Sequence, residues 1–267
     1  MRALLSRHGV AARKGLGQHF LCSSKVVDKI VGQFEGMQAV LEIGPGPGIL
    51  TVPLAALVGS VVALEVDEAM LPVLAETSPS VDVRLQDALK ADLGEILRSL
   101  PEPRGVVSNL PYYITAPLLQ SVAEARGDFS KAVLMMQREV GERILAPAGD
   151  RRRGSLSVYL QACFTMTKLA TVPPGAFAPP PKVESVVLLL EPKASDLGDD
   201  PEKFFRWVRA GFSQPRKTVS NNLSSAGVDR AQASAHFVEA GLTATARASD
   251  LTHEQWIAAY RALVSAR

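Results

Sequence analysis

Glu42-Ile43-Gly44-Pro45-Gly46-Pro47-Gly48 is the stretch that decides the fold of this 267-residue chain. It closes an apolar run, residues 39–43, that predicts a buried strand, and a helical run begins at Ile49. Glycines at a turn from strand to helix let a ligand approach the backbone without meeting Cβ atoms. Glycine turns also occur without ligands, so by itself this stretch predicts a strand–loop–helix unit and only suggests a binding loop.

The spacing of the next polar strand ends indicates what kind of sheet contains this unit. Apolar strands predicted at residues 61–64, 81–86 and 106–107 lead to Glu65, Asp87 and Asn109. The intervals from Gly44 onward are 21, 22 and 22 residues, the length of one strand plus one crossover helix. Polar residues therefore recur at the carboxyl ends of consecutive parallel strands, where open α/β sheets bind ligands.

The rest of the chain completes an α/β fold with a second, helical part. Helices are predicted at residues 24–34, 70–74, 93–100 and 116–125, and further strands at 132–136 and 183–190, the last from an antiparallel edge hairpin. Residues 172–181 contain five prolines and are expected to be extended. We predict a Rossmann-like, mostly parallel sheet with an antiparallel edge strand in a first domain, residues 1–193. An acidic, turn-rich stretch then leads to a small helical domain, residues 194–267.

Composition excludes several classes of protein. Hydrophobic residues make up 47% of the chain and charged residues 21%, which suits a folded domain with a sizeable core. The apolar runs are too short to span a bilayer, and residues 1–10 contain no apolar secretory segment. The two cysteines, Cys22 and Cys163, form no Cys-x-x-Cys pair, so we expect a cytoplasmic protein without disulfides or a metal site.

The distribution of charge is more informative than the net charge of +2. Residues 1–25 contain five basic and no acidic residues, residues 26–137 contain 7 basic and 14 acidic ones, and residues 138–267 contain 17 and 13. Basic ends around an acidic middle suit a polyanionic partner, although an unevenly charged, solvated surface explains the same counts.

The acidic strand ends favour a nucleoside ligand. Glu65 can accept both hydroxyls of a ribose, and Asp87 can accept a hydrogen bond from an adenine amine. The alternative for Glu65 is a solvated carboxylate at a helix start. Dehydrogenases also use a glycine loop with an acid, but theirs binds a pyrophosphate. Acidic walls suit the sulfonium cation of S-adenosylmethionine better, so a methyltransferase is the preferred interpretation.

Asn109-Leu110-Pro111-Tyr112 is the most informative tetrapeptide in the chain. The exocyclic amine of adenine is a poor nucleophile because its lone pair is delocalised into the ring. The Asn109 side-chain oxygen and the backbone carbonyl of Leu110 or Pro111 can accept its two N–H bonds and aim the lone pair at a methyl group. Tyr112 can stack on the flipped base. Catalysis would then consist of positioning and electrostatics; a plain turn at a strand end is the alternative.

Over nearly its full length the chain resembles the KsgA (RsmA) family of ribosomal RNA adenine dimethyltransferases. The resemblance rests on Arg13-Lys14-Gly15-Leu16-Gly17-Gln18-His19-Phe20-Leu21, the glycine loop, Glu65, Asp87-Ala88 and residues 109–112. Two more selective motifs match as well: Phe177-Ala178-Pro179-Pro180-Pro181-Lys182-Val183 and Phe212-Ser213-Gln214-Pro215-Arg216-Lys217-Thr218.

The resemblance implies a site and a reaction. S-adenosylmethionine would be contacted by His19, Leu21, Gly44, Gly46, Glu65, Asp87, Ala88 and Asn109. Residues 109–112 would handle the target amine, with Phe177 on the other face of the base. The reaction would place two methyl groups on each of two adjacent adenosines in the 3′-terminal hairpin loop of small-subunit (16S) ribosomal RNA. We expect a monomer that works on a precursor of the small ribosomal subunit, in ribosome assembly, with no membrane partner.

Two positions depart from the family pattern. Pro215 stands where a second arginine is usual, and His19 where asparagine is frequent, which adds a possible pH dependence. The basic residues expected to contact RNA phosphates are Arg13, Lys14, Arg151, Arg152, Arg153, Arg206, Arg209, Arg216 and Lys217. Arg206, Arg209 and Arg216/Lys217 recur at helical spacing, so one helix face is expected to carry them.

Three alternatives remain at this point. The first is an Erm-like methyltransferase of large-subunit RNA, which shares the first domain; the proline-rich segment, the C-terminal basic motif and the size of the helical tail argue against it. The second is an RNA-binding assembly or transcription factor that has lost turnover, against which the intact Glu65, Asp87 and residues 109–112 argue. The third is a nicotinamide dehydrogenase, for which no catalytic acid or base is apparent.

Overall fold

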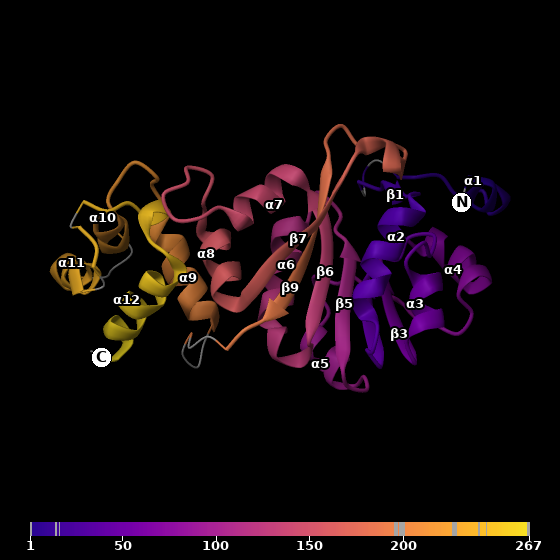
Figure 1. Cartoon of the computed structure of the whole chain (residues 1–267), viewed down its shortest axis with the longest axis horizontal. Coiled ribbons are helices and arrows are strands. Elements are labelled where there is room, and N and C mark those ends of the chain that lie inside the picture. Colours follow the sequence, from indigo (N-terminus) through magenta and orange to yellow (C-terminus); the bar gives the residue numbers. More distant parts are fainter. Residues whose placement is uncertain are drawn as a thin grey trace. The chain divides into compact units, whose positions relative to one another are not determined.

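The structure is a computed structural model that describes residues 2–13, 15, 17–194, 197, 201–225, 229–239, 241–243 and 245–265. The chain forms two compact units (Figure 1). The first contains residues 1–138 and 166–192, and the second contains residues 139–165 and 193–267. Each unit is described by itself.

A seven-stranded sheet in the order β4-β3-β2-β5-β6-β9-β7 organises the first unit. Its strands are β2 Ala39–Ile43, β3 Ser60–Glu65, β4 Asp82–Leu85, β5 Arg104–Asn109, β6 Lys131–Gln137, β7 Phe164–Val172 and β9 Ser185–Pro192. The pairs among β4, β3, β2, β5 and β6 are parallel, and β9 is antiparallel to β6. Figure 1 shows the strands from β3 to β7 side by side.

Helices cover the sheet because its strands are apolar on both faces. They are α2 Ser24–Val31, α3 Thr51–Leu57, α4 Leu71–Thr77, α5 Leu93–Arg98 and α6 Thr115–Glu124, with short 3₁₀ turns at Gly32–Phe34, Glu68–Met70 and Arg126–Asp128. On one face, Ile30 and Phe34 pack with Leu54 of α3 against Val40 and Val107. On the other, alternate strand residues such as Leu41 and Val106 are also buried.

The N-terminal arm is fixed by a small sheet of its own. β1 Phe20–Leu21 pairs antiparallel with β8 Phe177–Ala178, which follows a 3₁₀ turn at Pro174–Ala176 in the proline-rich segment. The arm begins with α1 Arg2–Arg7, whose Leu5 packs in a cluster with Phe20, Met70 and Val73. Residues at opposite ends of the first unit's sequence therefore meet beside the carboxyl end of β2.

The second unit is helical. It contains most of α7 Arg138–Leu145, then α8 Ser155–Cys163, α9 Pro201–Gly211, α10 Val219–Ser224, α11 Arg230–Glu239, a 3₁₀ turn at Ala248–Asp250 and α12 His253–Ser265. Helix α8 contacts α9 and α12, and these three lie together in Figure 1. Trp256 of α12 is fully buried and meets Trp207 edge-on with 5.1 Å between ring centroids. This aromatic packing gives the unit its own core.

The predicted fold class is confirmed, with the parallel strands at or within two residues of their predicted positions. Strand β7 was not predicted: only its last residue, Val172, lies in the proline-rich stretch that was read as extended. The division of the chain also differs from the predicted boundary at residue 193, since residues 139–165 group with the C-terminal helices. Contacts of α8 with helices that begin 38 or more residues later leave no local signature in the sequence.

Candidate functional site

Hydrogen bonds beyond the strands tie the carboxyl edge of the sheet into one rigid platform. The Gly44 N–H donates to the carbonyl of Leu64 (2.9 Å), and the Ser108 hydroxyl donates to the carbonyl of Ile43 (2.7 Å). The Leu110 N–H donates to the carbonyl of Met135 (2.9 Å). The sheet order reverses between β2 and β5, the place where α/β sheets open a crevice for ligands.

A cavity of about 230 Å³ lies at this edge, lined by residues of the first unit alone. Every residue predicted to bind the cofactor lines it: His19, Leu21, Gly44, Gly46, Glu65, Asp87, Ala88 and Asn109. Leu110, Pro111 and Tyr112 line it as well. The structure thus brings together residues from the arm and from the ends of four strands. The role of each residue stays a prediction.

The glycine loop approaches the arm closely. Gly44 and Gly46 have φ angles of +72° and +53°, in the left-handed region that favours glycine. A Cβ atom at Gly46 would lie 3.1 Å from the Phe20 ring, so a side chain at this position would force the ring to shift by a few tenths of an ångström. The loop is therefore shaped by its contact with Phe20 as well as by any ligand.

Glu65 is a buried carboxylate held by backbone N–H groups. Its Oε1 accepts from Val66 (2.9 Å) and Asp67 (2.8 Å), and its Oε2 accepts from Gly46 (3.0 Å). Burial raises the pKa of Glu65, and the three N–H groups oppose that rise. Because a carboxylate offers about four acceptor sites, Oε2 retains capacity for a hydroxyl donor.

Glu42 is a second carboxyl group in the cavity wall, and sequence reasoning missed it. It is 2% exposed, and its Oε2 has no hydrogen-bond partner among the described residues. Burial raises the pKa of Glu42 to about 7; the charge of Glu65 adds to the rise, and the buried Thr51 hydroxyl opposes it. The sequence places Glu42 near the ligand edge, as the second-to-last residue of β2, but it does not show whether the charge of this acid is compensated.

The Asn109 side chain is oriented by the arm. Its Nδ2 donates to the carbonyl of His19 (3.1 Å). This bond fixes the amide orientation and leaves the side-chain oxygen as an acceptor for another group. The Pro111 carbonyl accepts from the Ile114 N–H and the Thr115 hydroxyl, which occupies both of its lone pairs. Of the two carbonyls considered for an incoming amine, that of Leu110 is therefore the better placed.

His19 and Tyr112 form the wall between the arm and the Asn-Leu-Pro-Tyr turn. Their ring centroids lie 5.4 Å apart, the His19 Nδ1 is 2.8 Å from the carbonyl of Pro179, and the Tyr112 hydroxyl is 3.1 Å from the hydroxyl of Ser185. A carbonyl only accepts, so Nδ1 is the donor and carries the proton of the ring. Burial raises the pKa of the Tyr112 hydroxyl, which stays protonated.

Two aromatic residues differ from expectation. Phe177 does not belong to the described lining of the cavity: it is 4% exposed and packs in the core cluster with Leu21 and Val27. Pairing of β8 with β1 buries the ring, so in this conformation Phe177 is unavailable to a base. Tyr113, which was not singled out, lines the cavity and is 55% exposed. It is the freer of the two rings.

Two arginines of the N-terminal arm form ion pairs within the first unit. The Arg13 guanidinium pairs with the fully buried carboxylate of Asp67 at 3.0 Å, and Asp67 also accepts from Gln18 Nε2 at 2.9 Å. Farther along the arm, Arg7 pairs with Glu76 of α4 at 2.6 Å. Arg13 therefore anchors the arm, and its contact with RNA phosphate stays a prediction.

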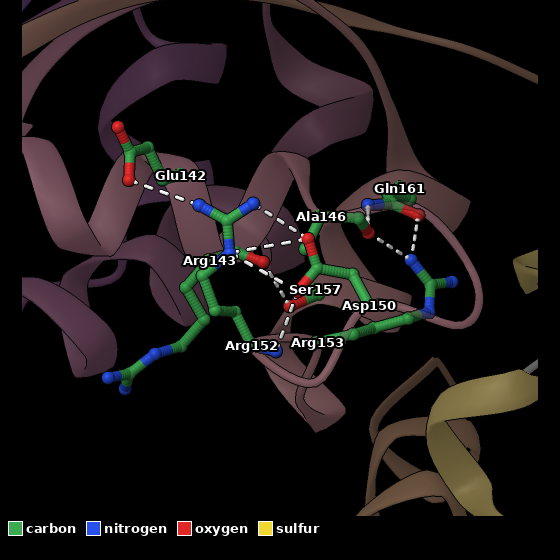
Figure 2. A network of polar contacts seen from close by, with 8 residues as sticks. All are labelled: Glu142, Arg143, Ala146, Asp150, Arg152, Arg153, Ser157 and Gln161. Atoms are coloured by element: carbon green, nitrogen blue, oxygen red, sulfur yellow. Dashed lines mark hydrogen bonds and ion pairs between the residues drawn. The ribbon is translucent and has the colours of Figure 1, made fainter.

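The three arginines of the basic loop, residues 150–154, have different surroundings, and Figure 2 shows those of Arg152 and Arg153. Arg151 is exposed, whereas Arg152 pairs with Asp150 (2.7 Å) and Glu142 (3.1 Å). Arg153 is 4% exposed and donates to the carbonyl of Ala146 (2.6 Å) and to the side chain of Gln161. Arg153 is thus a structural residue, and only Arg151 keeps the expected free surface position.

The remaining predicted RNA contacts are exposed but do not share one helix face. Arg206 pairs with Glu202 (3.5 Å) and Arg209 lies over the Phe205 ring (5.8 Å), both on α9. Helix α9 ends at Gly211, and the exposed Arg216 and Lys217 follow in a turn closed by the Lys217 N–H on the carbonyl of Gln214. The predicted continuous helix was wrong there; Lys14 lies outside the described residues.

Two general features complete the description. Over the described residues, no three His, Cys, Asp or Glu side chains come together in a way that would hold a metal ion. Among the helices that the structure describes, none is long and apolar enough to cross a membrane. Within the described part of the chain, Cys22 and Cys163 form no disulfide.

Fold, site and the relatives below together define a Rossmann-like methyltransferase of ribosomal RNA. The chain belongs to the ribosomal RNA adenine dimethylase family, which matches residues 9–264. It is similar to "Ribosomal RNA small subunit methyltransferase A" of Staphylococcus aureus (strain bovine RF122 / ET3-1), at 40% identity over 84% of this chain and 79% of the relative. The Staphylococcus carnosus (strain TM300) protein of the same name is 39% identical over 86% and 81%.

Two solved structures are similar over most of the chain. A dimethyladenosine transferase from Plasmodium falciparum aligns with a TM-score of 0.74 and 28% identity, covering 90% of this chain and 96% of its own. The 23S rRNA methyltransferase ErmE aligns with a TM-score of 0.69 and 26% identity, covering 92% and 99%.

The buried state of Glu42 predicts a pH-dependent stability. Its pKa is raised in the folded protein, so between pH 4.5 and 7 the folded state holds more protons than the unfolded one and loses stability as the pH rises. Glu42→Gln removes that loss and should raise the free energy of unfolding at pH 8 by up to about 3 kcal/mol, with no gain at pH 4.5. Denaturant titrations at both pH values measure it. A gain that is independent of pH would contradict the assigned cause.

The basic loop predicts opposite outcomes for adjacent arginines. Arg153→Ala leaves the side-chain oxygen of Gln161 without its donor and the Ala146 carbonyl with Gln161 Nε2 as its remaining donor, and it should cost about 1–3 kcal/mol of stability. Arg151→Ala, the matched control, changes an exposed side chain and should stay within about 0.5 kcal/mol. Chemical unfolding of both variants decides the matter, and equal losses would show that Arg153 is not a structural residue.

Proposed function

We propose that this enzyme uses S-adenosylmethionine to dimethylate N6 of two adjacent adenosines in the 3′-terminal hairpin loop of small-subunit (16S) ribosomal RNA. The observation that carries the proposal is the single cavity in which Glu65, Asp87 and Asn109 meet at the ends of successive parallel strands. The names of the Staphylococcus relatives support the small subunit as substrate.

The chemistry of the cavity fits this cofactor. Glu65 keeps a free acceptor position for ribose hydroxyls, and Asp87 offers a carboxylate whose Oδ1 takes the Leu89 N–H (3.0 Å), leaving Oδ2 for an adenine amine. The described residues that line the cavity include no lysine or arginine, and they contain an unpartnered buried carboxyl oxygen on Glu42. Such a set of carboxyl acceptors suits a nucleoside that carries a positive charge. When bound, the cofactor supplies the electrophilic methyl group.

The chain's own groups would activate the amine by position. The Asn109 oxygen and the Leu110 carbonyl would accept the two N–H bonds of N6, which draws the nitrogen toward tetrahedral geometry and directs its lone pair at the methyl group. No strong base is required before attack, because the proton becomes acidic only after the methyl has arrived. Tyr112 or the freer Tyr113 would hold the flipped base by stacking.

The helical part would dock RNA. Arg151, Arg216 and Lys217 are exposed and would contact phosphate groups of the RNA. In this proposal, residues 194–267 and the basic loop together form the RNA-docking domain. We infer a monomeric enzyme of the cytoplasm, acting on a precursor of the small subunit during ribosome assembly. Binding should weaken with salt.

A second candidate is methylation of large-subunit RNA, favoured by the similarity to the 23S rRNA methyltransferase ErmE. The sequence relatives at 39–40% identity carry the small-subunit name, and so this candidate ranks second. It predicts the same cofactor and the same role for Asn109, but a different RNA.

The experiment that tests the function separates both candidates. Labelled S-adenosylmethionine is incubated with unmodified small subunits and, in parallel, with unmodified large subunits, and digested RNA is analysed for N6,N6-dimethyladenosine. We expect label in the small subunit alone. Label in the large subunit would replace the proposed substrate, and binding without label would indicate an assembly factor that has lost turnover.

Loss of the Asn109 side chain tests the mechanism. Asn109→Ala removes a proposed acceptor for the reacting amine and should reduce methyl transfer by at least about 100-fold. Gln120→Ala, which removes an exposed amide of α6 that pairs with Glu124, is the matched control and should retain wild-type rates. Single-turnover transfer to small subunits is the measurement, and a rate near that of wild type for Asn109→Ala would refute the positioning role.

A further inference from the structure

The cavity wall contains two buried carboxyl groups in very different surroundings. Glu65 receives three backbone N–H bonds at 2.8–3.0 Å. Glu42, on the neighbouring strand, is 2% exposed and has an oxygen without any partner among the described residues. The hydrogen bonds compensate the charge of Glu65 but not that of Glu42.

Two adjacent buried carboxyl groups of this kind do not both ionise readily. The N–H groups favour the carboxylate of Glu65, whereas nothing comparable stabilises a carboxylate at Glu42. The other titratable groups that line the cavity are Asp87, His19, Tyr112 and Tyr113, and the neighbouring polar group from α3 is the Thr51 hydroxyl. No lysine or arginine is among the described lining residues, so none of these residues supplies a cation to pair with Glu42.

We propose that Glu42 makes the site selective for a positively charged cofactor by holding a proton in the empty cavity and releasing it when the cation binds. The inference rests on the proposed function, because S-adenosylmethionine carries a sulfonium charge that S-adenosylhomocysteine lacks. Ionised Glu42 attracts that charge in a buried site, where the interaction is strong. Because the raised pKa of Glu42 lies near neutrality, the exchange of its proton for a cation costs little free energy at cellular pH.

The exchange also favours turnover. Transfer of the methyl group converts the sulfonium to a neutral thioether and the amine R–NH₂ to R–NHCH₃, with one proton released. Once the sulfonium charge is gone, Glu42 takes up a proton from solvent, and the site loses its preference for the ligand it holds. Since each dimethylated adenosine consumes two cofactors, easier loss of the product cofactor serves the second transfer.

Calorimetric titration of the whole protein with each of the two nucleosides, in buffers of different ionisation enthalpy, measures the linked proton directly. We expect the wild type to release about half to one proton per S-adenosylmethionine at pH 6.5, and its affinity to rise about tenfold from pH 5.5 to 7.5 before levelling off. Glu42→Gln should release no proton. It should bind S-adenosylmethionine at least about tenfold more weakly at pH 7.5, while its affinity for S-adenosylhomocysteine changes less than about threefold.

Controls separate Glu42 from its neighbours. His19→Asn removes the histidine of the same wall and should retain the proton release; loss of the release in this variant but not in Glu42→Gln would overturn the proposal. Infrared difference spectra of the wild type need no variant, and they should show a protonated carboxyl band that disappears on binding of S-adenosylmethionine. Persistence of the band would contradict the inference.

The outcomes also separate this inference from the proposed function. If the wild type binds S-adenosylmethionine with a pH-independent affinity and no proton release, the role of Glu42 is refuted and the cofactor assignment stands. If it binds neither nucleoside at any pH, the proposed function itself fails, and the inference with it.

Discussion

Parallel pairing of β2 with β3 on one side and with β5 on the other is the constraint on which the site depends. The register aligns Ile43 with Leu64 and with Ser108, so the residues that follow these three positions emerge at one edge. Gly44, Glu65 and Asn109 are those residues, separated by 65 positions in sequence. A shift of one residue in either pairing would turn the side chains at these strand ends to opposite faces of the sheet. Burial of both faces under helices makes such a shift costly.

The N-terminal arm forms the part of the cavity wall that the sheet does not supply. β1 joins the proline-rich segment through β8, the carbonyl of His19 orients Asn109, and Phe20 covers Gly46. Ion pairs of Arg13 with Asp67 and of Arg7 with Glu76 hold the arm against the elements that follow β3. The positive charges of Arg7 and Arg13 therefore hold the arm in place beside the cavity. Charge counts along the sequence cannot separate this use from contact with a polyanion.

Much of the fold and of the cavity could be predicted from the sequence. The 21–22-residue rhythm and the apolar strands fix a parallel sheet, and a parallel sheet fixes where its polar ends meet, which is why eight predicted cofactor residues line one cavity. What failed depends on contacts far apart in sequence: the burial of Phe177 by β1, the use of Arg153 inside a helical unit, and the assignment of residues 139–165. Glu42 was missed because a strand acid gives no indication of whether its charge is compensated.

A crystal structure of the protein with S-adenosylhomocysteine tests the central claim most directly, namely that the carboxyl edge of the sheet holds a nucleoside and aims its sulfur at Asn109. The account predicts ribose hydroxyls on Glu65 Oε2, the adenine amine on Asp87, and the sulfur facing the Asn109 side chain. A ligand found elsewhere, or bound here with its ribose away from Glu65, would contradict the account.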